Sequence, residues 1–297
     1  MQRTAFAPAK VNLFLHVGPP GADGYHPLCS LMAFADVGDR LSLRLADTLG
    51  LTVTGPFAAG APASADNLVL RAAHALLARA RGPVAPAALV LDKQLPVAAG
   101  LGGGSSDAGA ALRLLREALE LDLDDDALQA VAAELGADGA ACLWGRPVIA
   151  EGRGERLSPA PALPVLDAVL VNPRVPVSTP QVYRRLDAAE AFGDVSPPPM
   201  PEAFETAAEL AGWLAGQRND LERPAIDVAP EVGAVLETLA GERESLLARV
   251  SGSGGTCFAL CASDIEAESL AERIEALAPG WWVRRCRLGG PWDPSLP

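Results

Sequence analysis

A glycine-rich segment that separates a short apolar run from a long one is the feature that most constrains this chain. It reads Leu95-Pro-Val-Ala-Ala-Gly-Leu-Gly-Gly-Gly-Ser-Ser-Asp107. Residues 87–91 have the composition of a strand, and residues 108–121 have that of a helix. Glycines let a backbone approach a ligand closely, and the free N–H groups and dipole at a helix start attract anions. The segment therefore predicts a phosphate-binding loop, with a flexible serine-capped turn as the alternative.

Two familiar phosphate-binding motifs do not fit this segment. No Lys-Ser or Lys-Thr pair follows the glycines, so the segment is not a Walker A loop. Ser105 stands where a dinucleotide-binding fingerprint has its third glycine, and the loop is longer than a tight strand-to-helix turn. A phosphate bound here would depend on backbone N–H groups and on a few placed cations.

Cations are scarce, because 24 basic residues face 37 acidic ones and the net charge is −13. Such a balance argues against a general nucleic-acid or anionic-membrane binder, which needs a broad positive face. Arginine supplies nearly all of the basic residues. The residue types that are rare in this chain are the lysines Lys10 and Lys93, the tyrosines Tyr25 and Tyr183, and the histidines His16, His26 and His74. Their positions are the first candidates for functional sites.

The five cysteines indicate neither a zinc site nor a disulfide framework. They are scattered, and no CxxC or CxxH spacing occurs among them. Cys257 and Cys261 lie four residues apart in an apolar run, which is typical of buried small side chains. No window approaches 18 uninterrupted apolar residues, so no membrane span is predicted. These observations favour a cytoplasmic protein without a membrane or nucleic-acid partner; they say nothing of its oligomeric state.

The remaining pattern predicts an α+β protein. Strands are expected at 9–17, 28–34, 40–45, 87–91, 168–171 and 281–287, and a glycine loop leads into another strand within 250–261. Helices are expected at 67–81, 108–121, 126–135, 202–214, 230–239 and 265–277. The composition turns to Pro, Gly and Arg over 148–167, and the proline-rich 195–201 is expected to be a loop. Because strands and helices mix without regular βαβ alternation, two domains are expected, at 1–155 and 156–297.

Three segments of the chain together resemble the motifs of the GHMP kinases, namely residues 7–17, 95–106 and 250–258. Residues 22–26, 135–138, 152–155, 177–183 and 219–222 resemble one branch of that superfamily, whose enzymes phosphorylate the 2-hydroxyl of a cytidine diphosphate derivative in non-mevalonate isoprenoid synthesis. The resemblance implies a domain like domain 2 of ribosomal protein S5 followed by a ferredoxin-like domain. It also implies ATP as phosphoryl donor and Mg²⁺ as its metal ion.

The resemblance assigns catalysis to Lys10 and Asp138. Taken alone, Lys10 in its apolar run is as readily a side chain that reaches the surface, and Asp138 is a turn residue after Gly136. As a pair, the carboxylate would accept the proton of the attacking hydroxyl, and the ammonium would lower the pKa of that hydroxyl and keep the carboxylate ionised. A lysine retained in a chain that otherwise uses arginine favours a compact ammonium over a planar guanidinium.

The resemblance also names binding residues. For ATP these are Pro96, Val97, Ala98, Ala99, Gly100, Leu101, Gly102, Gly103, Gly104, Ser105 and Ser106. For the substrate they are Asn12, Tyr25, His26, Asp138 and Tyr183, with the two tyrosines as walls around the cytosine and His26 at its polar edge. We expect His16 to be structural and His74 to be solvated or capping. Lys93 is not assigned to the binding site, because its position fits a solvated strand end as well as it fits an approach to the nucleotide.

The chain departs from the pattern that it resembles in two places. Ala98 and Ala99 stand where the pattern has glycines, and Gly139-Ala140 stands where it has Val-Pro after the catalytic Asp. The second change leaves the orientation of Asp138 open, and no carboxylate is recognisable as a magnesium ligand. The alternatives are a related kinase for another small alcohol, such as homoserine or mevalonate, and a catalytically silent nucleotide-binding homologue.

Overall fold

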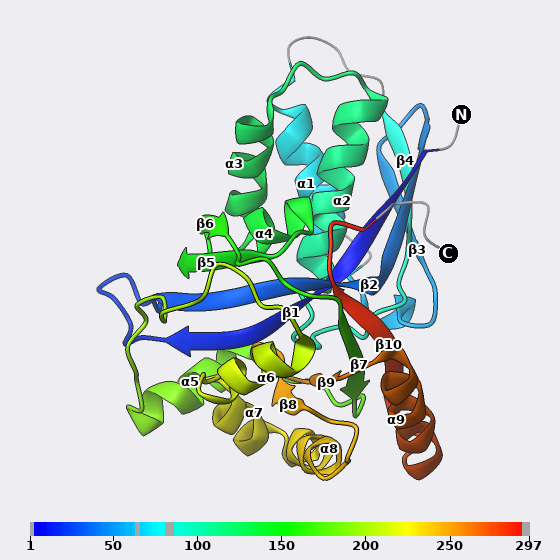
Figure 1. Cartoon of the computed structure of the whole chain (residues 1–297). Coiled ribbons are helices and arrows are strands. Elements are labelled where there is room, and N and C mark those ends of the chain that lie inside the picture. Colours follow the sequence, from blue (N-terminus) through cyan, green and yellow to red (C-terminus); the bar gives the residue numbers. More distant parts are fainter. Residues whose placement is uncertain (1–2, 63–65, 81–85, 293–297) are drawn as a thin grey trace.

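Two long strands, β1 (Arg3–Val17) and β2 (Leu28–Leu45), run through the middle of the molecule (Figure 1). The computed structural model describes residues 3–62, 66–80 and 86–292. The two strands pair antiparallel from Arg3↔Leu43 to Val17↔Leu28. β1 is buried from Ala5 onward, which is expected when both faces of a sheet are covered.

Helices cover one side of these strands in the N-terminal half of the chain. Its further elements are β3 (Gly50–Thr54), α1 (Leu68–Leu77), β4 (Ala87–Asp92), α2 (Gly103–Ala118), α3 (Asp125–Leu135), α4 (Gly139–Trp144), β5 (Val148–Gly152) and β6 (Arg156–Pro159). In Figure 1, α1, α2, α3 and α4 lie together on this side. The small and aliphatic side chains of α2, among them Ala111 and Leu115, face the core between helices and strands.

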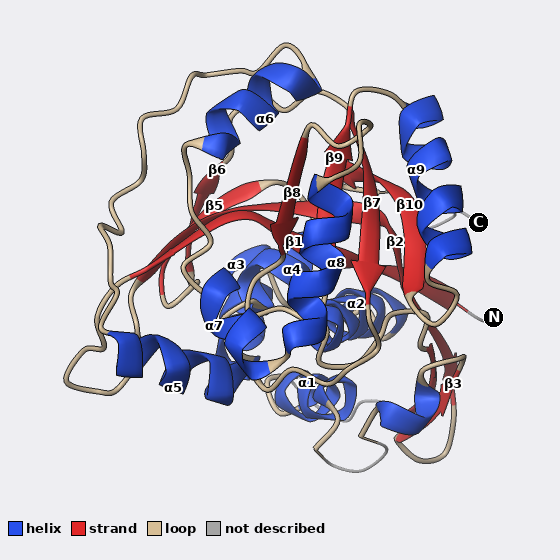
Figure 2. Cartoon of the chain, turned by 90° about the horizontal axis from the view of Figure 1, so that it is seen from below, coloured by secondary structure: helices blue, strands red, loops and turns tan. Residues whose placement is uncertain are grey.

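The C-terminal half lies on the other side of the long strands (Figures 1 and 2). Its elements are β7 (Leu166–Asn172), α5 (Thr179–Ala189), α6 (Ala207–Ala215), α7 (Glu222–Val228), α8 (Pro230–Ala240), β8 (Leu247–Val250), β9 (Cys257–Cys261), α9 (Asp264–Leu277) and β10 (Trp282–Gly289). Helix α9 packs on β10 and β7, and α8 packs on β8 and β9.

One sheet links the two halves within the described residues. Its main path has the order β3-β4-β2-β10-β7-β9-β8, while β1 and β5 pair with β2 and β6 pairs with β5. The link between β2 and β10 is short, with the register pairs Leu288↔Ala35 and Gly289↔Phe34. Strands β3 and β4 are parallel, and the pairs at the link and along β7 are antiparallel.

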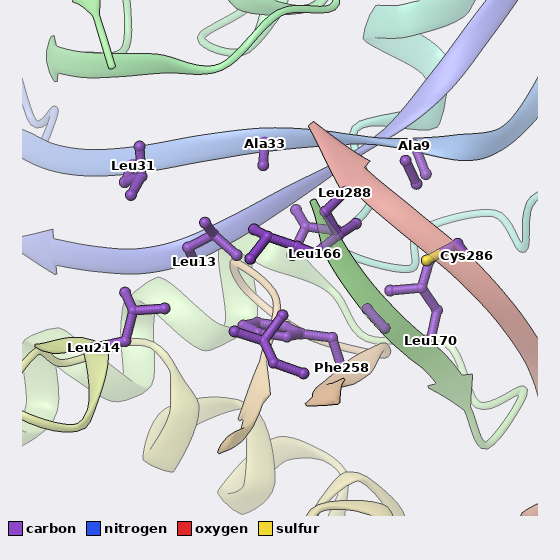
Figure 3. Packing of buried hydrophobic residues seen from close by; sticks show 14 of the residues in the cluster. Ala9, Leu13, Leu31, Ala33, Leu166, Leu170, Leu214, Phe258, Cys286 and Leu288 are labelled. Atoms are coloured by element: carbon purple, nitrogen blue, oxygen red, sulfur yellow. The ribbon is translucent and has the colours of Figure 1, made fainter. Parts of the chain in front are cut away.

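A shared hydrophobic core strengthens this short link. Leu13 and Leu31 from β1 and β2 lie in one buried cluster with Leu166, Phe258 and Leu288 from the C-terminal strands. Figure 3 shows these side chains meeting between the two long strands and the C-terminal strands. The core is therefore continuous across residue 155, where the sequence predicts a boundary.

Most predicted elements exist, but several bounds differ. The strands expected at 28–34 and 40–45 are one strand, β2, whose pairing with β1 continues through Gly38. A Cβ on Gly38 would overlap the carbonyl group of Ala7. Strands β5 and β6, which were not predicted, form a hairpin within 148–167. Helices α4, α5 and α7 were not predicted, and Arg81 at the end of the first predicted helix lies outside the described residues.

Candidate active site

A cavity of about 540 Å³ lies where β1, the start of α2 and the loop after β8 meet. Predicted site residues on its lining include Lys10, Asn12, Asp138 and Tyr183, together with residues 96–105 of the glycine loop. Ser106 is fully buried and is not part of that lining, nor are Tyr25 and His26. The structure thus brings most of the predicted residues into one cavity.

The glycine loop ends in a helix that starts earlier than its sequence predicts. Helix α2 begins at Gly103, so the N–H groups of Gly103, Gly104 and Ser105 lie in its first turn, where they lack intrahelical acceptors. Gly100 and Gly102 have φ values of 74° and 61°, which favour glycine. Because the loop lines the cavity, these N–H groups and the helix dipole are available to an anion there.

The glycine-containing loop before β9, residues 251–256, packs directly against the glycine loop that precedes α2. Thr256 N donates to Ala99 O at 3.0 Å, and Ser251 Oγ donates to Gly100 O at 3.1 Å. A Cβ on Gly100 would overlap the carbonyl of Ser251. Asn219 supports the same segment by donating to the carbonyls of Val250 and Gly252 at 2.8 and 2.9 Å.

Lys10 and Asp138 form an ion pair on the cavity. Lys10 Nζ lies 3.3 Å from Asp138 Oδ2 and donates to Asn12 Oδ1 at 2.6 Å. The lysine side chain is buried, whereas that of Asp138 is 31% exposed. Asn12 is itself held in place by donating to Ser30 Oγ at 2.8 Å. Asn12 and Asp138 therefore orient the Lys10 ammonium from two directions. The reading of Lys10 as a side chain that reaches the surface is wrong.

Irregularities in β1 decide which of its side chains face the cavity. The pairing with β2 shifts between Pro8 and Lys10 and again between Asn12 and Phe14. The second shift reverses the alternation, so that Leu15 and not Phe14 lines the cavity with Lys10 and Asn12. His16 therefore points away from the cavity. Its ring lies 4.8 Å from that of Phe14, and its Nε2 accepts a bond from Arg218 N at 3.4 Å, in agreement with a structural role.

Close packing of α4 fixes the orientation of Asp138. Asp138 is the N-cap residue of α4, although its side chain makes no capping bond. A Cβ on Gly139 would overlap the carbonyl of Ala132 in α3, so the valine of the family pattern could not occupy this position in the observed backbone. The tight α3–α4 contact provides the rigidity that the missing proline would have supplied.

Of the aromatic candidates, only Tyr183 lines the cavity. Tyr183, which lines it, packs on His26 with ring centroids 5.0 Å apart. Burial and the nearby charge of Asp138 raise the pKa of Tyr183 to about 12. His26 is held from both ring nitrogens, by Gly18 O at 2.8 Å and Asp187 Oδ1 at 3.2 Å. Tyr25 is 60% exposed, and the Arg153 guanidinium lies 4.3 Å from its ring centroid.

Lys93 is not a solvated strand end. It is 4% exposed, lines the cavity, and forms ion pairs with Asp39 and with Asp107, the latter at 2.8 Å. Burial alone would lower the pKa of Lys93, but the two carboxylates outweigh that effect and raise it. Sequence reasoning missed this cluster, although the rarity of lysine was a signal that pointed to it.

Comparison with known proteins assigns the chain and its fold to a family. The N-terminal domain profile of the GHMP kinases matches residues 67–146, and their C-terminal profile matches residues 200–280. A 4-diphosphocytidyl-2-C-methyl-D-erythritol kinase of Caulobacter sp. (strain K31) is 66% identical over 98% of this chain and all of its own length. The enzyme of the same name from Hyphomonas neptunium is 51% identical over 96% of each chain.

Solved structures agree with these sequence matches. The crystal structure of a 4-(cytidine 5'-diphospho)-2C-methyl-D-erythritol kinase superposes with a TM-score of 0.75 at 36% identity, covering 98% of this chain and all of the other. A homoserine kinase from Cytophaga hutchinsonii superposes with a TM-score of 0.67 at 20% identity, over 96% and 95% of the two chains, and shows the shared fold.

The chain belongs to the GHMP kinases, with their two-domain fold of mixed helix and sheet. Within that family its place is among the 4-diphosphocytidyl-2-C-methyl-D-erythritol kinases. It is a kinase, and the family implies ATP as its phosphoryl donor. No helix of the described residues is both long and apolar enough to cross a membrane.

Proposed function

We propose that this enzyme transfers the γ-phosphoryl group of ATP to the 2-hydroxyl of 4-diphosphocytidyl-2-C-methyl-D-erythritol, giving the 2-phosphate and ADP, as a step of non-mevalonate isoprenoid precursor synthesis. The names of full-length relatives at 46–66% identity support the substrate. The observation that carries the chemistry is the ion pair between Lys10 and Asp138, placed on one cavity with the start of α2.

In the proposed reaction the 2-hydroxyl oxygen attacks the γ-phosphorus in line with the bond to the β,γ-bridging oxygen. That bond breaks, and ADP leaves with its electron pair, while the hydroxyl proton passes to a carboxylate oxygen of Asp138. The buried Lys10 ammonium stabilises negative charge on the attacking oxygen, and Asn12 holds the ammonium in place. Residues 96–106 bind the phosphates through backbone N–H groups and the α2 dipole.

Mg²⁺ fits this site as an ion carried mainly by the nucleotide. Among the described residues no cluster of three His, Cys, Asp or Glu side chains could hold a metal ion. A magnesium ion bound chiefly by phosphate oxygens and water needs no such cluster. The hydroxyl of Ser105, in the first turn of α2 on the cavity, would be the protein's donor to it. When bound, the ion offsets the charge of the phosphates.

We propose that Tyr25 and Tyr183 are the walls that stack on the cytosine and that His26 binds its polar edge. Gly18 O and Asp187 Oδ1 engage both ring nitrogens of His26, so the ring would bind the base by exchanging its contact with the exposed Asp187 side chain. The contact of His26 with Tyr183 links it to the cavity. Arg153 covers one face of the Tyr25 ring, which leaves the other face for the base.

Replacing the exposed aromatic wall tests this assignment. Stacking on an aromatic ring contributes on the order of 1–3 kcal/mol per base. Tyr25→Ala should therefore raise KM for the cytidine substrate by about 5- to 100-fold and leave KM for ATP near the wild-type value. Tyr25→Phe is the matched control and should retain most of the affinity. An equal rise in both KM values for Tyr25→Ala would contradict stacking.

A coupled ADP-release assay with ATP and Mg²⁺ tests the reaction itself. The cytidine-containing alcohol should be turned over, and homoserine and mevalonate should not. Activity with either of those alcohols, or with none of the three, would refute the proposed substrate. Phosphorus NMR of the product should show a new phosphomonoester beside an intact diphosphate.

The organisation of the chain and its location follow as further proposals. We place the boundary between the two domains near residue 155, a position supported by the two family matches that lie on either side of it. A cytoplasmic location is supported by the five cysteines, which are all free and buried, as is ordinary in a reducing compartment.

A further inference from the structure

Among the residues that the structure describes, Lys93 is the one buried cation on the cavity that the proposed reaction does not use. The sequence contains two lysines, and both are buried on this cavity. Lys93 donates to Asp39 in β2 and to Asp107, the fifth residue of α2. A Cβ on Gly103 would lie 3.4 Å from Lys93 Nζ and 3.6 Å from Asp39 Oδ2, so the cluster lies directly beneath the helix start.

Asp39 also holds the other end of the glycine loop. Its Oδ1 accepts the backbone N–H groups of Gln94 at 2.6 Å and Leu95 at 2.9 Å, and its Oδ2 accepts the Lys93 ammonium. The Asp39 side chain is completely buried. The loop therefore leaves β4 with its first two N–H groups bound to a carboxylate that belongs to the central strand.

The backbone of Lys93 is itself fixed. Its N–H donates to Thr54 O at 2.8 Å, and its carbonyl accepts the N–H of Phe57 at 3.2 Å. From this anchored position its side chain crosses to Asp107 at the far end of the loop. Asp39, Lys93 and Asp107 thus join the two ends of the phosphate-binding loop to each other and to β2.

We propose that Asp39, Lys93 and Asp107 form a clasp that holds the glycine loop in its ATP-binding shape before ATP arrives. The three are positioning residues, acting through the loop backbone without touching the transferred group. A loop that is already ordered loses less conformational entropy on binding, so the clasp lowers the dissociation constant of ATP. The inference rests on the proposed role of this loop in binding ATP.

The clasp also explains why this position is a lysine in an arginine-rich protein. Lys93 offers several N–H groups from a single atom, which lets one compact ammonium serve two carboxylates. Burial and the neighbouring Asp39 raise the pKa of Asp107, and the Lys93 ammonium opposes that rise.

Binding of Mg-ATP to the full-length enzyme, measured by titration calorimetry without acceptor, tests the clasp. Asp39→Asn and Lys93→Met should each raise the dissociation constant by about tenfold. In the double variant the dissociation constant should also rise about tenfold and not a hundredfold, because the residues act as one unit. In turnover assays the variants should show a raised KM for ATP, an unchanged KM for the cytidine substrate and a kcat within about threefold of wild type.

Glu244→Gln is the matched control. Glu244 is a buried carboxylate paired with Arg243 and Arg273, and it is not part of the cavity lining. This variant should be destabilised without a change in ATP affinity. The clasp would be overturned if the two single variants bound Mg-ATP as tightly as wild type. It would also be overturned if the affinity losses of the single variants multiplied in the double variant.

Amide hydrogen exchange of the ATP-free wild-type enzyme keeps the test independent of how well the variants fold. The Gln94 and Leu95 amides should exchange slowly, because Asp39 already accepts them. Fast exchange at both positions would overturn a preformed clasp. Failure of the proposed function is a separate result, namely a wild-type enzyme that binds Mg-ATP but does not phosphorylate the cytidine substrate.

Discussion

At the scale of single residues, the two lysines show which site residues could be predicted from the sequence and which could not. Lys10 is found from the sequence because a motif surrounds it. Lys93 is not, since its two partners, Asp39 and Asp107, lie 54 and 14 residues away along the chain. Side-chain pairing at such separations depends on the register of the strands, which no local pattern specifies. The choice between an exposed and a buried lysine therefore required the fold.

Asp138→Asn isolates the proposed proton acceptor. The amide has the size of the carboxylate but cannot take up the hydroxyl proton, and general-base catalysis contributes about 10²- to 10⁴-fold. We expect kcat to fall by roughly that factor, while the calorimetric affinity for Mg-ATP changes by less than about threefold. Near-normal turnover by this variant would remove Asp138 from the role of base.

His16 should make folding stability depend on pH. Burial, together with the charge of Arg218, lowers the pKa of His16 below 6.5 in the folded protein. The unfolded chain therefore binds more protons near and below pH 6.5, so the stabilisation by neutral His16 is complete above that pH and declines as the pH falls.

Urea unfolding between pH 7.5 and 5.5 measures this dependence. The free energy of unfolding should fall less steeply in His16→Gln than in wild type, because glutamine does not titrate. Carboxylates with ordinary pKa values stay ionised in this interval and contribute equally to both proteins. Identical slopes would show that the protonation of His16 is not coupled to folding.

At the scale of elements, periodic segments were predictable and contact-dependent ones were not. Helix α9 and strand β4 follow their sequence patterns closely, because capping residues and alternation are local. Helix α4 has six residues and begins at a glycine, so its stability comes from packing on α3 and α2. Helix α2 starts earlier than predicted, at Gly103. Helix propensity alone would not favour a glycine there, so this early start likewise depends on the packing of the loop.

The α3–α4 contact gives a prediction at this scale. Any side chain on Gly139 would overlap Ala132 O, so Gly139→Val must push the two helices apart and move Asp138 with them. We expect a loss of at least about 2–3 kcal/mol in the free energy of unfolding, as is usual for overpacked positions, and a fall in kcat of at least tenfold.

Ala140→Pro is the matched comparison for Gly139→Val, because it tests the other half of the departure from the family pattern. Ala140 is the second residue of α4, and a proline is tolerated in the first turn of a helix. This variant should retain most of the activity. A fully active and stable Gly139→Val enzyme would show that α4 does not hold Asp138 in place.

At the scale of the whole molecule, the α+β class and the family were accessible from the sequence, but the way the halves join was not. Composition changes indicate a boundary near residue 155, yet the buried cluster that contains Leu13 and Leu31 also contains Leu166 and Phe258. Apolar residues identify what is buried and not which partners they meet. The continuity of the core therefore emerged only from the structure.

This continuity predicts that the two halves unfold together. Scanning calorimetry should show one transition whose van't Hoff and calorimetric enthalpies agree. Leu13→Ala, at the junction, should lower the stability by about 2–5 kcal/mol and shift the whole transition without splitting it. Two resolved transitions in the wild-type enzyme would show that the domains are independent despite their shared core.

The burial of both lysines has a consequence for protein chemistry. A reagent that acylates primary amines finds neither lysine side chain on the outside of this enzyme. A label on Lys10 or Lys93 would therefore have entered the cavity, and the rate at which that label appears would report how often the cavity opens.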